Sequence, residues 1–132
     1  MKIQEAIRAH LSADASVTGA VGQRIYVGGV PESSTFPAAV ITTVNVNREH
    51  SQDGSSGFAT GAFDIDLVAP TIAAAKAAAD LVRVALVGFR GSMGGGSGVS
   101  VEGVFAEDES HNYDDELALH IVTLTVSIEF LE

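Results

Sequence analysis

The side chains of this chain that could take part in chemistry are few, and the first to consider are Asp64 and Asp66. Two carboxylates at this spacing occur in metal-dependent transferases, where they share a divalent cation. Apolar residues alternate with the pair, so both carboxylates fall on the polar face of a predicted strand, and that position alone accounts for their spacing. A small metal-dependent enzyme that uses Asp64, Asp66 and the acids of residues 107–109 remains an alternative to a plain strand.

The other reactive residue types do not form the pattern of a catalytic or binding site. There is no cysteine, and no serine lies in a nucleophile-elbow sequence. The glycine run at residues 91–98 lacks the lysine of a phosphate-binding loop. The histidines have no ligand spacing; they are His10, His50, His111 and His120. His120, on an apolar strand face, is interpreted as a hydrogen-bonded core or interface histidine. We therefore expect no catalytic residue, no metal and no cofactor.

The composition of the chain limits its class and its partners. Its 132 residues suffice for one domain, residues 1–132, and a hydrophobic content of 46% excludes a disordered chain. Seven basic against 17 acidic residues give a net charge of −10, which argues against gripping nucleic acid or an anionic membrane. No apolar run approaches membrane-spanning length, and the first ten residues show no signal-peptide pattern.

The charges are distributed unevenly along the chain. All seven lysines and arginines lie at or before Arg90, and seven carboxylates are concentrated in residues 102–116. Two interpretations stay open at this point. The acidic segment is a solvated loop that aids solubility, or it is a surface that repels a polyanion.

The first half of the chain alternates between helix and strand patterns. Apolar spacing predicts a helix at residues 2–11, followed by a short turn that contains Val17 and Val21. Strands are predicted at residues 23–27, 37–48 and 58–68. The polar residues 49–57 are predicted to form a long, mobile hairpin tip.

The second half begins with an alanine-rich helix, for which Thr71 is the expected N-cap. Residues 91–98 are expected to be a flexible connection, residues 99–108 a strand, and residues 108–115 a polar turn. The last segment is the strongest strand pattern. The prediction is an α+β domain of order α-β-β-β-α-β-β. It has one mostly antiparallel sheet of four to five strands, with two helices packed on one face.

The alanine-rich helix is apolar around most of its circumference, unlike a helix on the surface of a monomer. One apolar stripe, from Ile72 to Leu86, is enough to face the core. The second apolar face is therefore predicted to contact a neighbouring copy of the chain. Its residues are Ala74, Ala77, Ala78, Leu81 and Ala85.

Four pieces of the sequence, which together span almost the whole chain, carry a resemblance. They are the first helix with DASV at residues 14–17 and GQRIY at 22–26, FPAAV at 36–40, the strand and alanine helix through GFRG at 88–91, and EDE at 107–109 before a tyrosine turn and a long strand. In this order and spacing the chain resembles the tail terminator or tail completion proteins of tailed phages, prophages and gene transfer agents, also described as tail-to-head joining proteins.

The resemblance implies a structural protein of the virion tail, assembled in the host cytoplasm. The family forms a ring, usually of six subunits, that caps the tail tube, ends its polymerisation and joins the head-side connector or stopper. DNA passes through the centre without specific binding, and no membrane is involved. Another neck or minor tail component of similar fold is the nearest alternative.

Two further hypotheses follow from the ring. An acidic lumen would not retain DNA, and its candidate residues are Asp64, Asp66, Glu107, Asp108, Glu109, Asp114 and Asp115. Polar segments that become ordered on contact would dock to the tube or connector. Their candidate residues are Ser51, Gln52, Asp53, Gly54, Ser55, Ser56, Gly94, Gly95 and Gly96.

Overall fold

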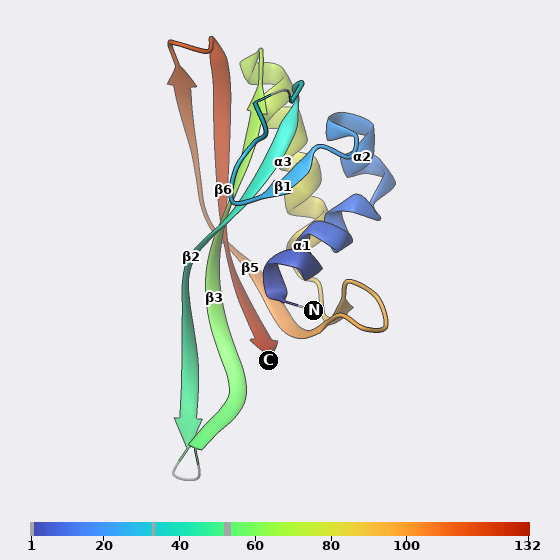
Figure 1. The fold of residues 1–132 in the computed structure, drawn as a ribbon, viewed down its shortest axis with the longest axis vertical. Coiled ribbons are helices and arrows are strands. Elements are labelled where there is room, and N and C mark those ends of the chain that lie inside the picture. Colours follow the sequence, from blue (N-terminus) through green and yellow to red (C-terminus); the bar gives the residue numbers. More distant parts are fainter. Residues whose placement is uncertain (1, 33, 52–53) are drawn as a thin grey trace.

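The computed structural model describes residues 2–32, 34–51 and 54–132, which form one sheet and a helical layer (Figure 1). Within these ranges the strand order is β1-β2-β3-β6-β5-β4; β1 and β2 are parallel, and every other neighbouring pair is antiparallel. The elements are α1 (Ile3–Ser12), α2 (Ala15–Val21), β1 (Ile25–Val27), β2 (Ala38–Ser51), β3 (Gly54–Ala69), α3 (Ile72–Leu86), β4 (Gly91–Met93), β5 (Val99–Asp114) and β6 (Leu119–Leu131).

The α+β class and the single, mostly antiparallel sheet are confirmed, but the predicted numbers of elements are wrong. The described residues form six strands and three helices, not four to five strands and two helices. The predicted turn after α1 is a helix, because the Asp14 carboxylate accepts hydrogen bonds from the N–H groups of Ser16 and Val17.

Part of the predicted glycine-rich connection is also ordered. Gly91–Met93 pairs with β5 as β4, and Gly94 and Gly95 form the turn between the two strands. Both glycines have positive φ values, 90° and 88°, which allow a tight turn that other residues rarely adopt. The expectation of a purely flexible segment is therefore wrong for Gly94, Gly95 and Gly96, which belong to this turn.

Two predicted loops are largely strand. The expected tip at residues 49–57 is shortened because β2 continues to Ser51 and β3 starts at Gly54, so Ser55 and Ser56 are strand residues. Gln52 and Asp53 lie outside the described residues. The expected polar turn at residues 108–115 is mostly β5, because its backbone pairs with β6 as far as Asp114. Polar side chains did not prevent strand formation here, since one side of this hairpin faces water.

One face of the sheet carries the core. In Figure 1 all three helices lie on the same side of the sheet, with α3 against β3 and β6, α1 against β1 and β2, and α2 beside α3. The buried side chains of β3 and β6 alternate for most of their length, which places all of them except Val68 and Leu119 beneath the helices. The largest fully buried side chains are Phe63, Phe130, Ile7, Leu11, Ile25, Ile41, Ile65, Leu67, Leu86, Met93, Leu124 and Ile128.

The opposite face, here called the open face, carries no helix (Figure 1). Cross-strand register places Asp64 and Asp66 of β3 on it, opposite Thr125 and Thr123 of β6. At one end of this face lie four buried apolar residues, one of which, Leu119, shares a pocket with Val30, Pro31 and Phe36 of the segment that joins β1 to β2. The four buried residues are Ala38, Val40, Val68 and Leu119. The remainder of the open face is accessible to solvent or to a partner.

Candidate assembly surfaces

The carboxylates of Asp64 and Asp66 are held by threonines across the β3–β6 pair. The Thr125 hydroxyl donates a hydrogen bond of 2.6 Å to Asp64 Oδ1, and the Thr123 hydroxyl donates one of 2.6 Å to Asp66 Oδ1. Both aspartates are partly buried. Within the described residues no group of three or more His, Cys, Asp and Glu side chains is placed to hold a metal ion. The two carboxylates thus belong to the polar face of the sheet.

The acidic segment of β5 does not form one surface. Asp108 pairs with Thr125, so it lies on the open face beside Asp64. Its neighbour Glu109 pairs with Leu124, a core residue, and therefore lies on the helical side. There Glu109 forms an ion pair with Lys76 of α3, and this hydrogen bond raises the pKa of the lysine. Glu107 is the extra residue of a β-bulge between these faces.

The β5–β6 hairpin ends in a tight acidic turn. Asp114 Oδ1 accepts hydrogen bonds from the N–H groups of Glu116 and Leu117, which fixes the turn. Leu117 is 66% exposed and Tyr113 is 51% exposed. Asp115 lies in the same turn. Ala118 ends the turn with a φ of 54° and is exposed.

A histidine pair lies beside this turn. His111 Nε2 and His120 Nδ1 are 3.0 Å apart, and the two rings stack with centroids 5.3 Å apart. The ring of Tyr113 also contacts the ring of His120, with ring centroids 4.7 Å apart. His120 is thus hydrogen-bonded, as predicted, but it is half-buried and does not belong to the core.

The outer surface of α3 is narrower than predicted. Thr71 caps the helix by accepting a hydrogen bond from the Ala74 N–H, as expected. Ala78 is only 2% exposed and belongs to the core, so its assignment to a surface for a second copy is wrong. Ala74, Leu81 and Ala85 are half-buried against the core.

Ala77 remains exposed on α3 and shares a face with Ala73 and with Val84, which is 72% exposed. We call Ala73, Ala77 and Val84 the α3 strip. It keeps the character predicted for a contact surface, since its side chains are small and apolar and are not covered by other described elements.

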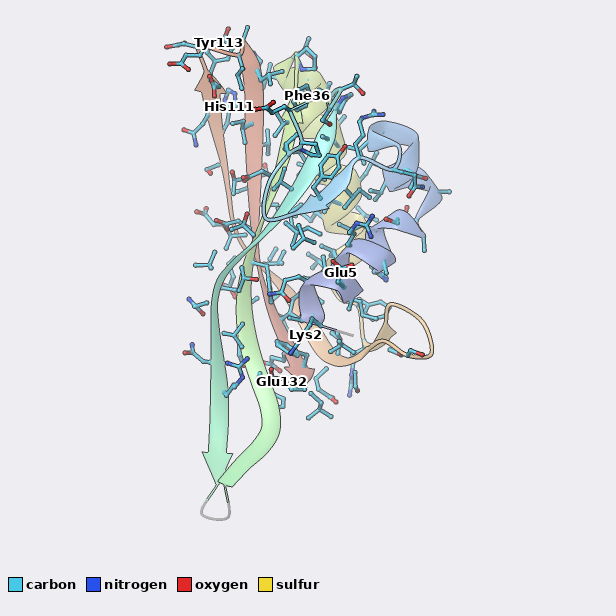
Figure 2. All side chains as sticks on the ribbon, in the orientation of Figure 1. Lys2, Glu5, Phe36, His111, Tyr113 and Glu132 are labelled. Carbon is cyan, nitrogen blue, oxygen red and sulfur yellow. The ribbon has the colours of Figure 1, made fainter. Side chains whose placement is uncertain are left out.

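A groove of about 630 Å³ lies far from the β5–β6 turn, between the base of that turn's hairpin and the β2–β3 hairpin, where Lys2 and Glu132 are labelled in Figure 2. We call it the basal groove. Arg48 of β2 spans it and binds Glu132 in a bidentate ion pair, with N–O distances of 2.5 and 3.0 Å. Its lining residues are Lys2, Ile3, Gln4, Val46, Arg48, Gly98, Val99, Phe130, Leu131 and Glu132.

The family described as tail completion protein gp17 matches residues 5–129. This chain belongs to the tail completion protein family. Among solved structures, it is similar to a chain in the virion of a native gene transfer agent particle, with a TM-score of 0.76 and 22% sequence identity. The match covers 98% of this chain and 95% of that one. No curated protein sequence matches.

Membership in the tail completion family settles the broad class. The protein is a structural component of a phage-like virion tail and not an enzyme, as the resemblance implied. None of the helices in the described part of this tail completion protein is long and apolar enough to cross a membrane.

The residues of the basal groove were not identified by sequence reasoning. They come from four separated stretches: residues 2–4, 46–48, 98–99 and 130–132. Only the β2–β3–β6 pairing brings Arg48 next to Glu132, 84 positions later in the chain. No local pattern in a single sequence carries that information.

Proposed function

We propose that this tail completion protein forms a ring, hexameric in its simplest form, at the end of the tail tube. The ring ends tube polymerisation, contacts the head-side connector and lets DNA pass through its centre. Family membership over residues 5–129 supports the assignment to tail completion. The similar chain in the gene transfer agent virion is matched along nearly its whole length. This match supports a chain of this fold as one complete subunit of such a particle.

The observation that carries this proposal is the separation of charge between the two faces of the sheet. The cross-strand registers of β2, β3, β5 and β6 place no lysine or arginine at an open-face position, although all seven lie in the described residues. The open face carries Asp64, Asp66, Asp108 and Asp114 instead.

A surface of this kind suits a DNA conduit. Proteins hold DNA by neutralising phosphates with lysine and arginine, and the released counterions supply much of the affinity. A lumen without cations and with several carboxylates releases no counterions from DNA and gains no affinity in this way, so DNA slides past it. We assign Asp64, Asp66 and Asp108 to the lumen, with Asp114 at its end. Glu109 faces α3, and Glu107 and Asp115 lie in a bulge and a turn, so these three are weaker candidates.

Contact between subunits requires two different side surfaces, since a closed ring is built from head-to-tail contacts. The α3 strip is proposed as one of them, with Ala77 at its centre and Ala74, Leu81 and Ala85 along its margin. Small side chains permit the close approach of a neighbouring backbone. The β2–β3 hairpin projects beyond the body of the subunit (Figure 1) and, with the turn at Gly94–Gly96, is proposed to reach the tube or connector.

The ring is tested by electron microscopy of the protein mixed with its own tube protein. We expect annular density with a central channel at one end of each tube, and tubes of uniform end structure. Density along the side of the tube, or in another part of the neck, would instead favour the alternative of a minor tail component. Deletion of residues 51–56 should preserve the ring and reduce its attachment to the tube.

The conduit is tested by duplex DNA binding at low salt. The natural protein should not bind, whereas the triple variant Asp64→Lys, Asp66→Lys and Asp108→Lys should bind, with affinity that falls as salt rises. Tight binding by the natural protein would contradict an inert lumen. A triple variant that binds no better would show that the open face is not accessible to DNA.

A further inference from the structure

The basal groove combines positive charge with an apolar floor. Lys2 and Arg48 face a single carboxylate, Glu132, whose pKa is lowered by the Arg48 hydrogen bond and also by the charge of Lys2. Phe130 and Val99 supply the floor and are almost fully buried. Among the side chains that line the groove, two are cationic and one is acidic, and the floor offers a surface for a small apolar side chain.

The start of α1 adds to the preference of this groove for a carboxylate. The helix begins at Ile3, and its N-cap residue Lys2 makes no side-chain hydrogen bond to the first turn. The N–H groups of a first turn carry partial positive charge and ordinarily receive a capping acceptor. In the other long helix, α3, Thr71 supplies that acceptor. In α1, a carboxylate from outside the subunit would fill this role.

The β5–β6 turn has complementary chemistry. Residues 115 and 116 are Asp and Glu, and no lysine or arginine follows Arg90 in the chain. Leu117, at 66% exposure, provides an apolar side chain next to these carboxylates. The hydrogen bonds that the Asp114 carboxylate accepts hold the turn in one shape, which reduces the conformational entropy lost on docking.

We propose that the basal groove of one subunit receives the β5–β6 turn of a neighbouring copy. The carboxylates of Asp115 and Glu116 lie against Lys2 and the uncapped first turn of α1, and Leu117 packs on the apolar floor. The turn and the groove are well separated in the subunit, as the labels of Tyr113 and of Lys2 and Glu132 show in Figure 2, so a turn cannot occupy its own groove.

This contact deepens the proposed ring and rests on it. Because the two surfaces differ, each subunit offers a turn on one side and a groove on the other, which is the head-to-tail arrangement that closes into rings. Charge complementarity fixes the register and suppresses wrong pairings. The occupant is thus a second copy of this chain, whereas a tube or connector segment in the groove is an outcome that the experiment detects.

A charge exchange tests the contact. The groove variant is Lys2→Glu, and the turn variant combines Asp115→Lys with Glu116→Lys. Each alone places like charges together, and we expect association to weaken by about ten-fold or more. Mixed in equal amounts, the two variants are complementary at every contact and should recover association. Arg90→Glu is the matched control, since its side chain lies outside both surfaces, and it should associate like the natural protein.

A disulfide test gives an independent reading, because the chain has no cysteine of its own. The double variant Lys2→Cys and Leu117→Cys is assembled with its tube protein and oxidised. Covalent ladders of this chain alone support the contact. Intact assemblies without ladders, disulfides to a tube protein that carries an added cysteine, or a failure of natural copies to associate would each overturn it. If microscopy still shows the ring in the first two cases, only this contact fails and the proposed function stands.

Discussion

The Thr125 hydroxyl and the Asp64 carboxylate are joined across two antiparallel strands by a hydrogen bond of 2.6 Å, and they are direct partners in the strand register. Thr123 and Asp66 repeat the arrangement two residues along. Each hydroxyl donates one hydrogen bond to its carboxylate and leaves the negative charge of that carboxylate in place. The open face is therefore acidic and ordered at the same time.

Replacement of Thr125 by Val removes this donor while keeping the β-branched shape. We expect the free energy of unfolding to fall by about 1 kcal/mol. This is a small value for a hydrogen bond to a charged group, because the site is partly exposed. Urea denaturation measures the change. Thr60→Val on the same face is the control, since Thr60 has no side-chain hydrogen bond within the described residues; an equal loss there would point to strand packing.

Gly61 of β3 lies against the rings of the core. A Cβ atom at this position would be 2.5 Å and 2.7 Å from two ring carbons of the fully buried Phe63. Gly61→Ala should therefore cost about 1–3 kcal/mol through overpacking. Gly19→Ala in α2 provides the contrast, because nothing lies within 4 Å of its Cβ position. That change should raise stability by up to about 1 kcal/mol. Thermal unfolding measures the change in stability of each variant. Equal changes in the two variants would contradict the packing of Gly61 against Phe63.

Substitutions at two adjacent residues of α3 should distinguish an effect on assembly from an effect on folding. Ala77 is exposed in the subunit, whereas Ala78 is 2% exposed in its core. Ala77→Glu should change the free energy of unfolding by less than about 0.5 kcal/mol and still prevent ring formation. Ala78→Glu should destabilise the subunit by more than about 3 kcal/mol, since it buries an unpaired charge. Urea denaturation and native mass spectrometry measure the two effects. Rings that form normally from the Ala77 variant would remove α3 from the interface.

The Arg48–Glu132 pair predicts a dependence on pH. The guanidinium lowers the pKa of Glu132 below its ordinary value of 4.5. A carboxylate with a lowered pKa stabilises the folded state fully above its ordinary value, and this contribution is lost as the pH falls through the folded pKa. In Arg48→Gln, NMR titration should show the pKa of Glu132 rising towards 4.5. Arg90→Gln should not change it. An unchanged pKa in the Arg48 variant would show that the pair is absent in solution.

The elements with strong periodicity could be predicted from the sequence. The alternation in β6 identified its core face from Val122 to Phe130, and the apolar spacing and the capping Thr71 located α3. The start of α1 and the polar face of β3 were also predictable, because each depends on residues close together in the chain.

The remaining features depend on partners distant in sequence. Parallel pairing of β1 with β2, the short β4, and the continuation of β5 through its acidic half are fixed by neighbouring strands. Ala78 and Ala77 look alike in sequence, and only the position of β6 and β3 beneath α3 distinguishes a core residue from a surface one. The basal groove, assembled from four segments, had no local pattern at all.

The bulge at Glu107 has a consequence for everything beyond it. A strand alternates strictly, so a single inserted residue inverts the orientation of every later side chain. Because Glu107 is that residue, Asp108 faces the acidic side while Glu109, His111 and Tyr113 face the helices. If Glu107 instead took a regular place opposite Thr125, each later residue of β5 would move one position along β6, and His111 and Tyr113 would turn to the face that now displays carboxylates.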